Sequence, residues 1–279
     1  NYIGRLDATG AAAAAGLANT GNGIHVAGAR AIIGGPNAGD RNVIAGNALN
    51  QINIAATGNS AIVIGNHIGT NLAGTVDVDG AATRGVGHSG IIVSGASGVR
   101  IGGLTAAERN LVSGNDYYGI ELVDGANNTQ VLGNYVGTDI TGQLALGNGQ
   151  GIGMWSVGAG NVIGGAATGA GNVVAGNREV GISVGYVSQP NRIQGNRIGL
   201  SADGLTAVTN VGTGMEVVQV QGLLIGTDGN GSDDAAEGNR FVAPSRTALA
   251  LIGNNTAGNI VAGNRFGLAA DGTTSLGLG

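Results

Sequence analysis

The 279-residue chain contains no cysteine and no lysine, only three prolines, and few aromatic residues, 3% of the total. The absence of cysteine excludes a disulfide framework and thiolate metal sites. All 12 basic residues are arginine, and the net charge of -5 argues against nucleic-acid binding or a polybasic membrane anchor. No apolar tract approaches the ~20 residues that a membrane-spanning helix needs. We therefore expect no nucleic-acid partner and no membrane insertion.

What the chain has in abundance is glycine, with 58 residues, together with 42% apolar residues that are mostly Ala, Ile, Val and Leu. This apolar content excludes a disordered chain. Glycine does not recur at every third position and proline is rare, so a collagen helix is also excluded. The core must be built from small aliphatic side chains in a fold that uses many tight turns.

The sequence repeats with a period of about 66 residues. The segment GNHIGT at 65–70 recurs in related form at 133–138, 195–200 and 263–268. NVIAGN at 42–47 recurs in related form at 110–115 and 172–177. IGG at 33–35 recurs with the same spacing, at 101–103 and 163–165. Three markers with one period predict a single repeat domain over residues 1–279, with about four long repeats of 62–68 residues. The chain opens on the tail of a further copy, so we expect it to be a fragment of a longer protein.

Each long repeat divides again, because Gly-Ile-x-Val segments occur twice per period. They begin at Gly23, Gly90, Gly119, Gly151, Gly181 and Gly214. Short runs in which Ile, Val or Leu alternate with small residues, each closed by Gly-Asn or Asn-Gly, are typical of strands and turns. This pattern, which shows no helical periodicity, predicts an all-β parallel solenoid of about eight coils. The recurrent asparagines, such as Asn42 and Asn66, are expected to form ladders at the turns.

These motifs resemble the repeats of bacterial secreted right-handed parallel β-helix proteins in the pectin-lyase-like superfamily. The resemblance covers the whole chain and implies a right-handed helix and an extracellular location. It leaves the function open, since that superfamily includes polysaccharide lyases, hydrolases, adhesins and stalk segments. Its hydrolases resemble one another in clustered aspartates with His-Gly and Arg-x-Lys motifs. This chain has no lysine and no His-Gly.

We find no catalytic constellation from the residues themselves. Glycoside hydrolysis needs two carboxyl groups about 5–9.5 Å apart. Glu121 and Glu216 occupy the same outward strand position but about three coils, or roughly 14 Å, apart. The three histidines, His25, His67 and His88, fall on different positions of the repeat and are expected to be solvated. The catalytic residues are therefore unassigned, and the interpretation leans against an enzyme.

One acidic loop departs from the repeat, at residues 227–237. Its candidate calcium ligands are Asp228, Asn230, Ser232, Asp233 and Asp234. Alternating oxygen side chains are typical of calcium loops, although the sixth and twelfth positions do not match an EF-hand. The alternative is a solvated turn. No cofactor is expected to be required, and a bound metal would be a structural Ca²⁺.

Five of the eight aromatic residues lie between positions 117 and 186. With the charged residues of the same coils they form a candidate carbohydrate-binding patch: Tyr117, Tyr118, Glu121, Trp155, Arg178, Glu179 and Tyr186. Aromatic rings stack on sugar rings. The alternative is that these side chains simply cover the coil surface.

The leading interpretation is a structural segment of a secreted or cell-surface bacterial protein, such as a rigid stalk, an adhesin or a filament-forming solenoid. The near-uniform repetition favours it. The second hypothesis is a polysaccharide-binding or polysaccharide-cleaving domain, a lyase or glycoside hydrolase, that uses the patch. The corresponding partners are a polysaccharide or neighbouring solenoid chains stacked end to end, since the end strands are unpaired.

Overall fold

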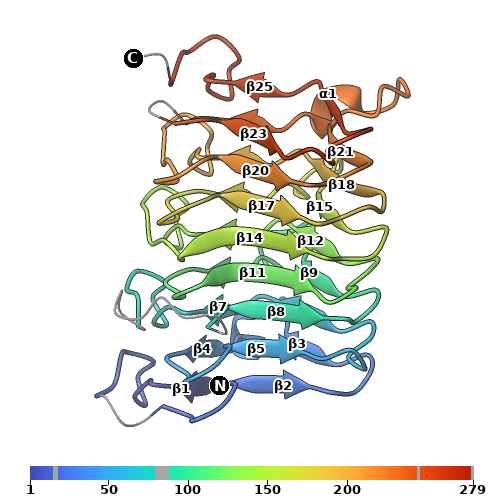
Figure 1. Cartoon of the computed structure of the whole chain (residues 1–279). Helices are drawn as coiled ribbons and strands as arrows, with labels where there is room; N and C mark the ends of the chain where they lie inside the picture. The colour runs from blue at the N-terminus through green and yellow to red at the C-terminus, as the bar shows by residue number, and fades with distance from the viewer. Residues whose placement is uncertain (15–17, 79–87, 244–245, 278–279) are drawn as a thin grey trace.

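A computed structural model describes residues 1–14, 18–78, 88–243 and 246–277 of the chain. Strands stack into three parallel sheets, and each turn of the chain contributes one strand to each sheet in the same order (Figure 1). The chain winds upward from the N-terminal to the C-terminal end as a right-handed parallel β-helix of about eight coils. The predicted fold class is confirmed.

We number the sheets in the order in which the chain visits them. Sheet 1 contains β1 (Tyr2–Gly4), β4 (Val43–Ala45), β7 (His67–Ile68), β10 (Leu111–Val112), β13 (Tyr135–Val136), β16 (Val173–Val174), β19 (Arg197–Ile198), β22 (Arg240–Phe241) and β25 (Arg265–Phe266). Sheet 2 contains β2 (Ile24–Val26), β5 (Ile52–Ile54), β8 (Ile91–Ser94), β11 (Tyr118–Val123), β14 (Gln150–Trp155), β17 (Ile182–Gly185), β20 (Met215–Val218) and β23 (Leu249–Ile252). Sheet 3 contains β3 (Ile32–Gly34), β6 (Ile62–Ile64), β9 (Arg100–Gly102), β12 (Gln130–Leu132), β15 (Val162–Gly164), β18 (Asn191–Gln194), β21 (Leu223–Gly226) and β24 (Ile260–Ala262).

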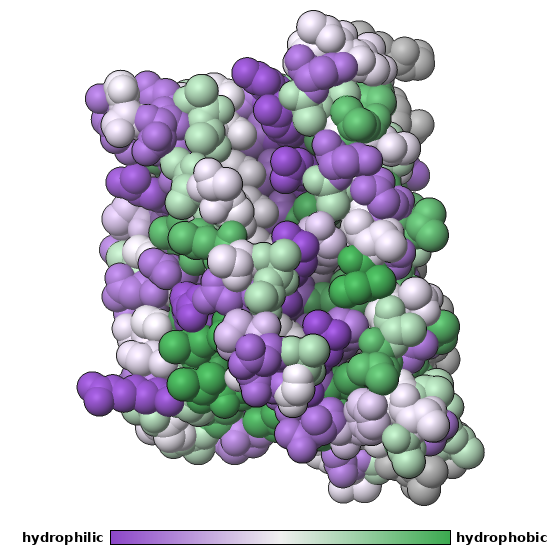
Figure 2. Space-filling model, turned by 180° about the vertical axis from the view of Figure 1, so that it is seen from behind, coloured by the Kyte–Doolittle hydropathy of each residue, from purple (hydrophilic) through white to green (hydrophobic). Residues whose placement is uncertain are grey.

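Helical structure in the described ranges is limited to a short 3-10 turn, Ala38–Asp40, and one turn of α-helix, α1 (Asp234–Glu237). Within those ranges, no helix has the length and apolar character required to cross a bilayer. Figure 2 shows the side of the molecule away from sheet 2, where hydrophilic and hydrophobic residues are interspersed from end to end.

The core consists of aliphatic columns that run along the helix axis. In sheet 2, Ile91 pairs with Ile120, which pairs with Ile152, and all three side chains are fully buried. Burying such a side chain contributes about 1.5–3 kcal/mol. The Gly-Ile-x-Val segments all lie in this sheet, so the predicted alternation of inward and outward positions is confirmed.

The Ile-Gly marker reflects a steric requirement at the end of the sheet 3 strands. Gly102 has a φ of +80°, and a Cβ atom there would lie 2.0 Å from the carbonyl oxygen of Leu132 in the next coil. Only glycine accommodates both the left-handed conformation and this close approach. Gly34, Gly164 and Gly226 meet the same constraint in other coils.

The recurrent asparagines form one continuous ladder between sheets 3 and 1. Each side-chain Nδ2 donates to the Oδ1 of the next rung at 2.8–3.1 Å. The rungs are Asn1, Asn42, Asn66, Asn110, Asn134, Asn172, Asn196, Asn239 and Asn264. The two asparagine series seen in the sequence are alternate rungs of this ladder. The ladder prediction is thus confirmed.

A second, shorter ladder lies between sheets 1 and 2. It joins Asn115, Asn148, Asn177 and Asn210 at 2.8–3.0 Å. Both ladders satisfy buried turn amides and carbonyls that would otherwise be left without partners in these tight corners.

Every second strand of sheet 1 is followed by a hairpin. These covering hairpins span residues 6–12, 70–77, 138–145, 200–207 and 268–275, and each is closed by an antiparallel bridge. They stack on one another: Leu72 N donates to Gly10 O at 2.8 Å, and Ala270 N donates to Gly204 O at 2.7 Å. A small apolar cluster of Val173, Ala175 and Val208 lies beneath them. The 66-residue period is therefore two coils, one with a hairpin and one without.

Candidate functional site

The aromatic residues on the outer face of sheet 2 are positioned by glycines of neighbouring coils. The Tyr118 ring lies over Gly153, where an added Cβ would come within 2.8 Å of a ring carbon. The Trp155 indole lies over Gly185 in the same way, with 2.1 Å to a ring carbon. Gly153 and Gly185 thus leave the room that the rings occupy. The repeat pattern does not distinguish these two glycines from the many others in the chain.

Hydrogen bonds hold the aromatic residues in place. Trp155 Nε1 donates to the Tyr118 hydroxyl at 2.9 Å, and that hydroxyl lies 3.0 Å from Ser183 Oγ. Tyr118 is buried, and burial raises the pKa of its hydroxyl to about 12. Three coils therefore contribute to one fixed network. Ser183 was not predicted as part of it, because its contact with Tyr118 spans two coils.

The Trp155 and Tyr186 rings form the accessible part of the surface. Their centroids are 6.0 Å apart, and Tyr186 is 58% exposed. Tyr117 packs edge-on against Tyr118 at 4.6 Å. An apolar ring surface with polar groups beside it is suited to contact with the face of a sugar ring. We call Tyr117, Tyr118, Trp155 and Tyr186 the aromatic shelf.

Glu121 lies beside the shelf and is largely buried. Its carboxylate accepts a hydrogen bond from Ser89 Oγ at 2.7 Å. Burial raises its pKa, which the Ser89 bond partly offsets and the charge of Asp124 reinforces. The pKa of Tyr117 is raised by burial and then by the charges of Glu121 and Glu179. Both carboxylates thus act on the Tyr117 hydroxyl through their charge.

Arg178, which was predicted to belong to the carbohydrate-binding patch, forms ion pairs with two aspartates. Its Nη2 lies 2.8 Å from Asp77 Oδ2, and its Nη1 lies 3.9 Å from Asp116 Oδ1. The structure thus places Glu121 beside the shelf, while the Arg178 guanidinium is held by two carboxylates. The ion pair between Arg178 and Asp77 links residues 101 positions apart in the sequence, and the repeat pattern does not predict it.

The outward column of sheet 2 confirms the predicted carboxylate spacing. Glu121 is followed in register by Gly153, then Ser183, then Glu216. Three coil steps at about 4.8 Å separate the two glutamates by about 14 Å. That is too far for a glycosidase pair of carboxyl groups.

The acidic loop gathers a different set of carboxylates from the one predicted. One oxygen from each of Asp228, Asp234 and Glu237 lies within 4.8 Å of the others. Asn230 Oδ1 instead accepts from Ser232 N within the loop, and Asp233 stands before α1 in a left-handed conformation. Of the five predicted ligands, therefore, Asp228 and Asp234 converge.

These carboxylates also have protein partners. Asp228 accepts from Arg192 at 3.3 Å, and Asp234 accepts from Thr227 Oγ1 at 2.9 Å. Glu237 accepts the backbone N–H of Asp228 at 2.9 Å. The loop is thus closed by its own hydrogen bonds, while its oxygen-rich donor set fits a hard cation such as Ca²⁺.

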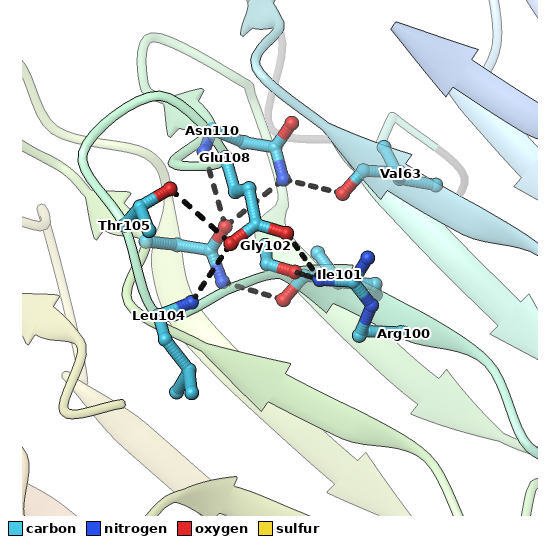
Figure 3. A network of polar contacts seen from close by, with 9 residues as sticks. Val63, Arg100, Ile101, Gly102, Leu104, Thr105, Glu108 and Asn110 are labelled. Atoms are coloured by element: carbon cyan, nitrogen blue, oxygen red, sulfur yellow. Dashed lines mark hydrogen bonds and ion pairs between the residues drawn. The ribbon is translucent and has the colours of Figure 1, made fainter. Parts of the chain in front are cut away.

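The role of Glu237 recurs in other coils that lack any acidic cluster. Glu108 accepts the N–H of Leu104 at 3.2 Å and the hydroxyl of Thr105, and it pairs with Arg100 at 3.0 Å (Figure 3). Asp40 accepts the N–H of Asn37 at 3.2 Å. All three acids lie two positions before a rung of the long asparagine ladder. A carboxylate here closes the loop that leaves sheet 3.

The expectation of three solvated histidines is wrong for His67. It is 3% exposed beneath the hairpin of residues 70–77, and burial, with a contribution from Arg41, lowers its pKa to about 4. Its position on sheet 1 is outward, but the hairpin covers that face. The sequence alone did not show that the outer face of sheet 1 is covered.

The sheets, ladders and covering hairpins define a repeat protein of the parallel β-helix class. No protein-family model and no curated protein matches the chain. Among solved structures, the chain is similar to a pectate lyase, Pel9A, with 11% identity and a TM-score of 0.41 over 92% of this chain and 71% of the lyase. It is also similar to the Dettilon tailspike protein, with 13% identity and a TM-score of 0.28 over 84% of this chain and 56% of the tailspike. At these values neither likeness assigns an activity or a substrate to this chain.

Proposed function

We propose that the chain is a structural segment, a rigid β-helical stalk of a secreted or cell-surface protein. The observation that carries the proposal is the long asparagine ladder, which passes through nine rungs without interruption. An enzyme of this architecture would be expected to break its repeat around a cleft. Here the strands of all three sheets stay in register over a rod about 40 Å long, at ~4.8 Å per coil.

A screen for catalysis tests the structural proposal. The purified chain is incubated with neutral and acidic polysaccharides, and products are followed by unsaturated-sugar absorbance and by reducing ends. We expect no turnover. Turnover of any polymer that is lost in Glu121→Gln would overturn the proposal, because Glu121 is a buried carboxyl group beside the aromatic shelf.

A second function, glycan binding without cleavage, is favoured by the aromatic shelf. The exposed Tyr186 ring beside Trp155 is the specific observation. If the wild-type chain binds a polysaccharide in a binding screen, we expect Trp155→Ala to abolish that binding. Tyr2→Ala, which removes an exposed ring far from the shelf on sheet 1, is the matched control. Equal binding by both variants would remove the shelf from consideration and leave the stalk function intact.

A further inference from the structure

Three arginines form a column at the C-terminal end of sheet 1. Arg197 pairs in register with Arg240, and Arg240 pairs with Arg265. In earlier coils the same column holds the neutral residues Tyr135 and Val173. The residues of this column thus change from neutral to arginine towards this end. We call Arg197, Arg240 and Arg265 the arginine column.

The guanidinium groups of the column have few partners. Arg240 Nη1 donates to the carbonyl oxygens of Ala269 and Ala270, at 3.4 and 2.9 Å, in the hairpin of residues 268–275. Arg197 Nε is buried without a hydrogen-bond acceptor. Arg265 lies exposed at the end of the sheet. In the part of the chain that the structure describes, the ion pairs of arginine involve Arg100, Arg178 and Arg192 and none of this column.

The acidic residues of the two nearby hairpins are held in their own turns. Asp203 accepts from Ser201 Oγ at 2.5 Å and from Leu205 N at 2.9 Å. Asp271 accepts from the N–H groups of Thr273 and Thr274, both at 2.8 Å. The carboxylates stabilise the hairpins, and among the described residues neither forms an ion pair with an arginine of the column.

The column is electrostatically unfavourable as it stands. Burial lowers the pKa of Arg240, and the charges of Arg265 and Arg197 lower it further. Neighbouring coils lie about 4.8 Å apart, so the three like charges repel at short range. In the earlier coils the same column of sheet 1 holds neutral side chains, Tyr135 and Val173, which do not repel one another. An anion placed between the guanidinium groups would remove the repulsion.

We propose that the arginine column is an oxyanion-binding site that holds a sulfate, phosphate or carboxylate group between Arg240 and Arg265, with Arg197 completing the positive field. Guanidinium groups donate two parallel N–H bonds to such oxyanions and carry little hydration to lose. Two kinds of ligand could supply the bound oxyanion: a free inorganic ion, or an acidic substituent of a polysaccharide. This site is on sheet 1, so it is independent of the aromatic shelf on sheet 2.

Titration with sodium sulfate tests the site. Binding is measured by calorimetry, and the melting temperature is compared in sodium sulfate and sodium chloride at equal ionic strength. We expect a sulfate-specific rise in melting temperature. Arg265→Gln and Arg240→Gln should each weaken sulfate binding at least tenfold. Arg192→Gln is the matched control, because it removes the same charge from sheet 3 and should leave sulfate binding unchanged.

The variants also separate binding from folding. Arg265 is exposed on the last strand of sheet 1, so Arg265→Gln should fold with an unchanged circular dichroism spectrum. Equal effects of sulfate and chloride on the wild-type protein would overturn the proposal. Full sulfate affinity in Arg265→Gln would overturn it as well.

A second titration, with polygalacturonate and with monomeric galacturonate, identifies the source of the oxyanion. Arginine-dependent binding of the polymer assigns the site to an acidic glycan. Sulfate binding without polymer binding assigns it to a free ion.

Discussion

Removing one rung from the middle of the long asparagine ladder should destabilise the whole rod. Asn134 is fully buried. Its Nδ2 donates to Ile101 O at 2.9 Å and to Asn172 Oδ1 at 3.1 Å. Its Oδ1 accepts from the backbone N and the Nδ2 of Asn110, at 3.3 and 3.0 Å. The substitution Asn134→Ala deletes all four contacts in one step.

The cost follows from the hydrogen bonds that the substitution removes. Asn110 Nδ2 still donates to Val63 O at 2.8 Å (Figure 3). Asn172 Oδ1 still accepts from the backbone N of residue 134 at 2.9 Å. The substitution removes four hydrogen bonds, two to Asn110, one to Ile101 and one to Asn172. At about 1 kcal/mol net for each, we expect a loss of about 4 kcal/mol in the free energy of unfolding.

Urea unfolding followed by circular dichroism measures this loss. The control is Asn37→Ala, whose exposed side chain bonds only locally to Asp40 and should change stability by less than about 1 kcal/mol. Asn134→Asp keeps the shape but removes donors and buries a charge at neutral pH, so its loss should be larger at pH 7 than at pH 4. A loss for Asn134→Ala no greater than for the control would refute the reasoning that the ladder is a stabilising element.

Three further predictions concern the core, a buried histidine and the acidic loop. Ile120→Asp places an unpaired charge in the fully buried column of sheet 2 and should abolish cooperative folding, whereas an unchanged melting temperature would mean that the strand register is wrong. The pKa of His67 is lowered to about 4 in the folded chain from its ordinary 6.5, so only the unfolded state takes up this proton as the pH falls between those values. The free energy of unfolding should therefore drop by about 3 kcal/mol between pH 6.5 and 4. In urea unfolding at several pH values, the variant His67→Leu should lack this drop. A calcium ion held by Asp228, Asp234 and Glu237 would raise the melting temperature and EDTA would reverse the rise, whereas a curve insensitive to both Ca²⁺ and EDTA would leave the loop closed by its hydrogen bonds alone.

The fold was largely predictable because a solenoid translates sequence periodicity directly into contacts between neighbouring coils. The recurrence of Asn42 and Asn66 with the repeat was enough to predict ladders, and the Gly-Ile-x-Val segments predicted the strand register of sheet 2. The candidate site was less predictable. Tyr118, Trp155 and Ser183 belong to three coils, and their contacts depend on side-chain direction and on the space above Gly153 and Gly185.

The sequence by itself determined the coil architecture, since alternation of aliphatic residues, positive-φ glycines and turn asparagines are local requirements repeated in every coil. Only the tertiary structure decided what covers the outer faces. The covering hairpins bury His67 and bind the Arg240 guanidinium, and the ion pairs of Arg178 join residues far apart in the chain. Such contacts depend on how loops fold back over a sheet, and a repeat pattern carries no information about that choice.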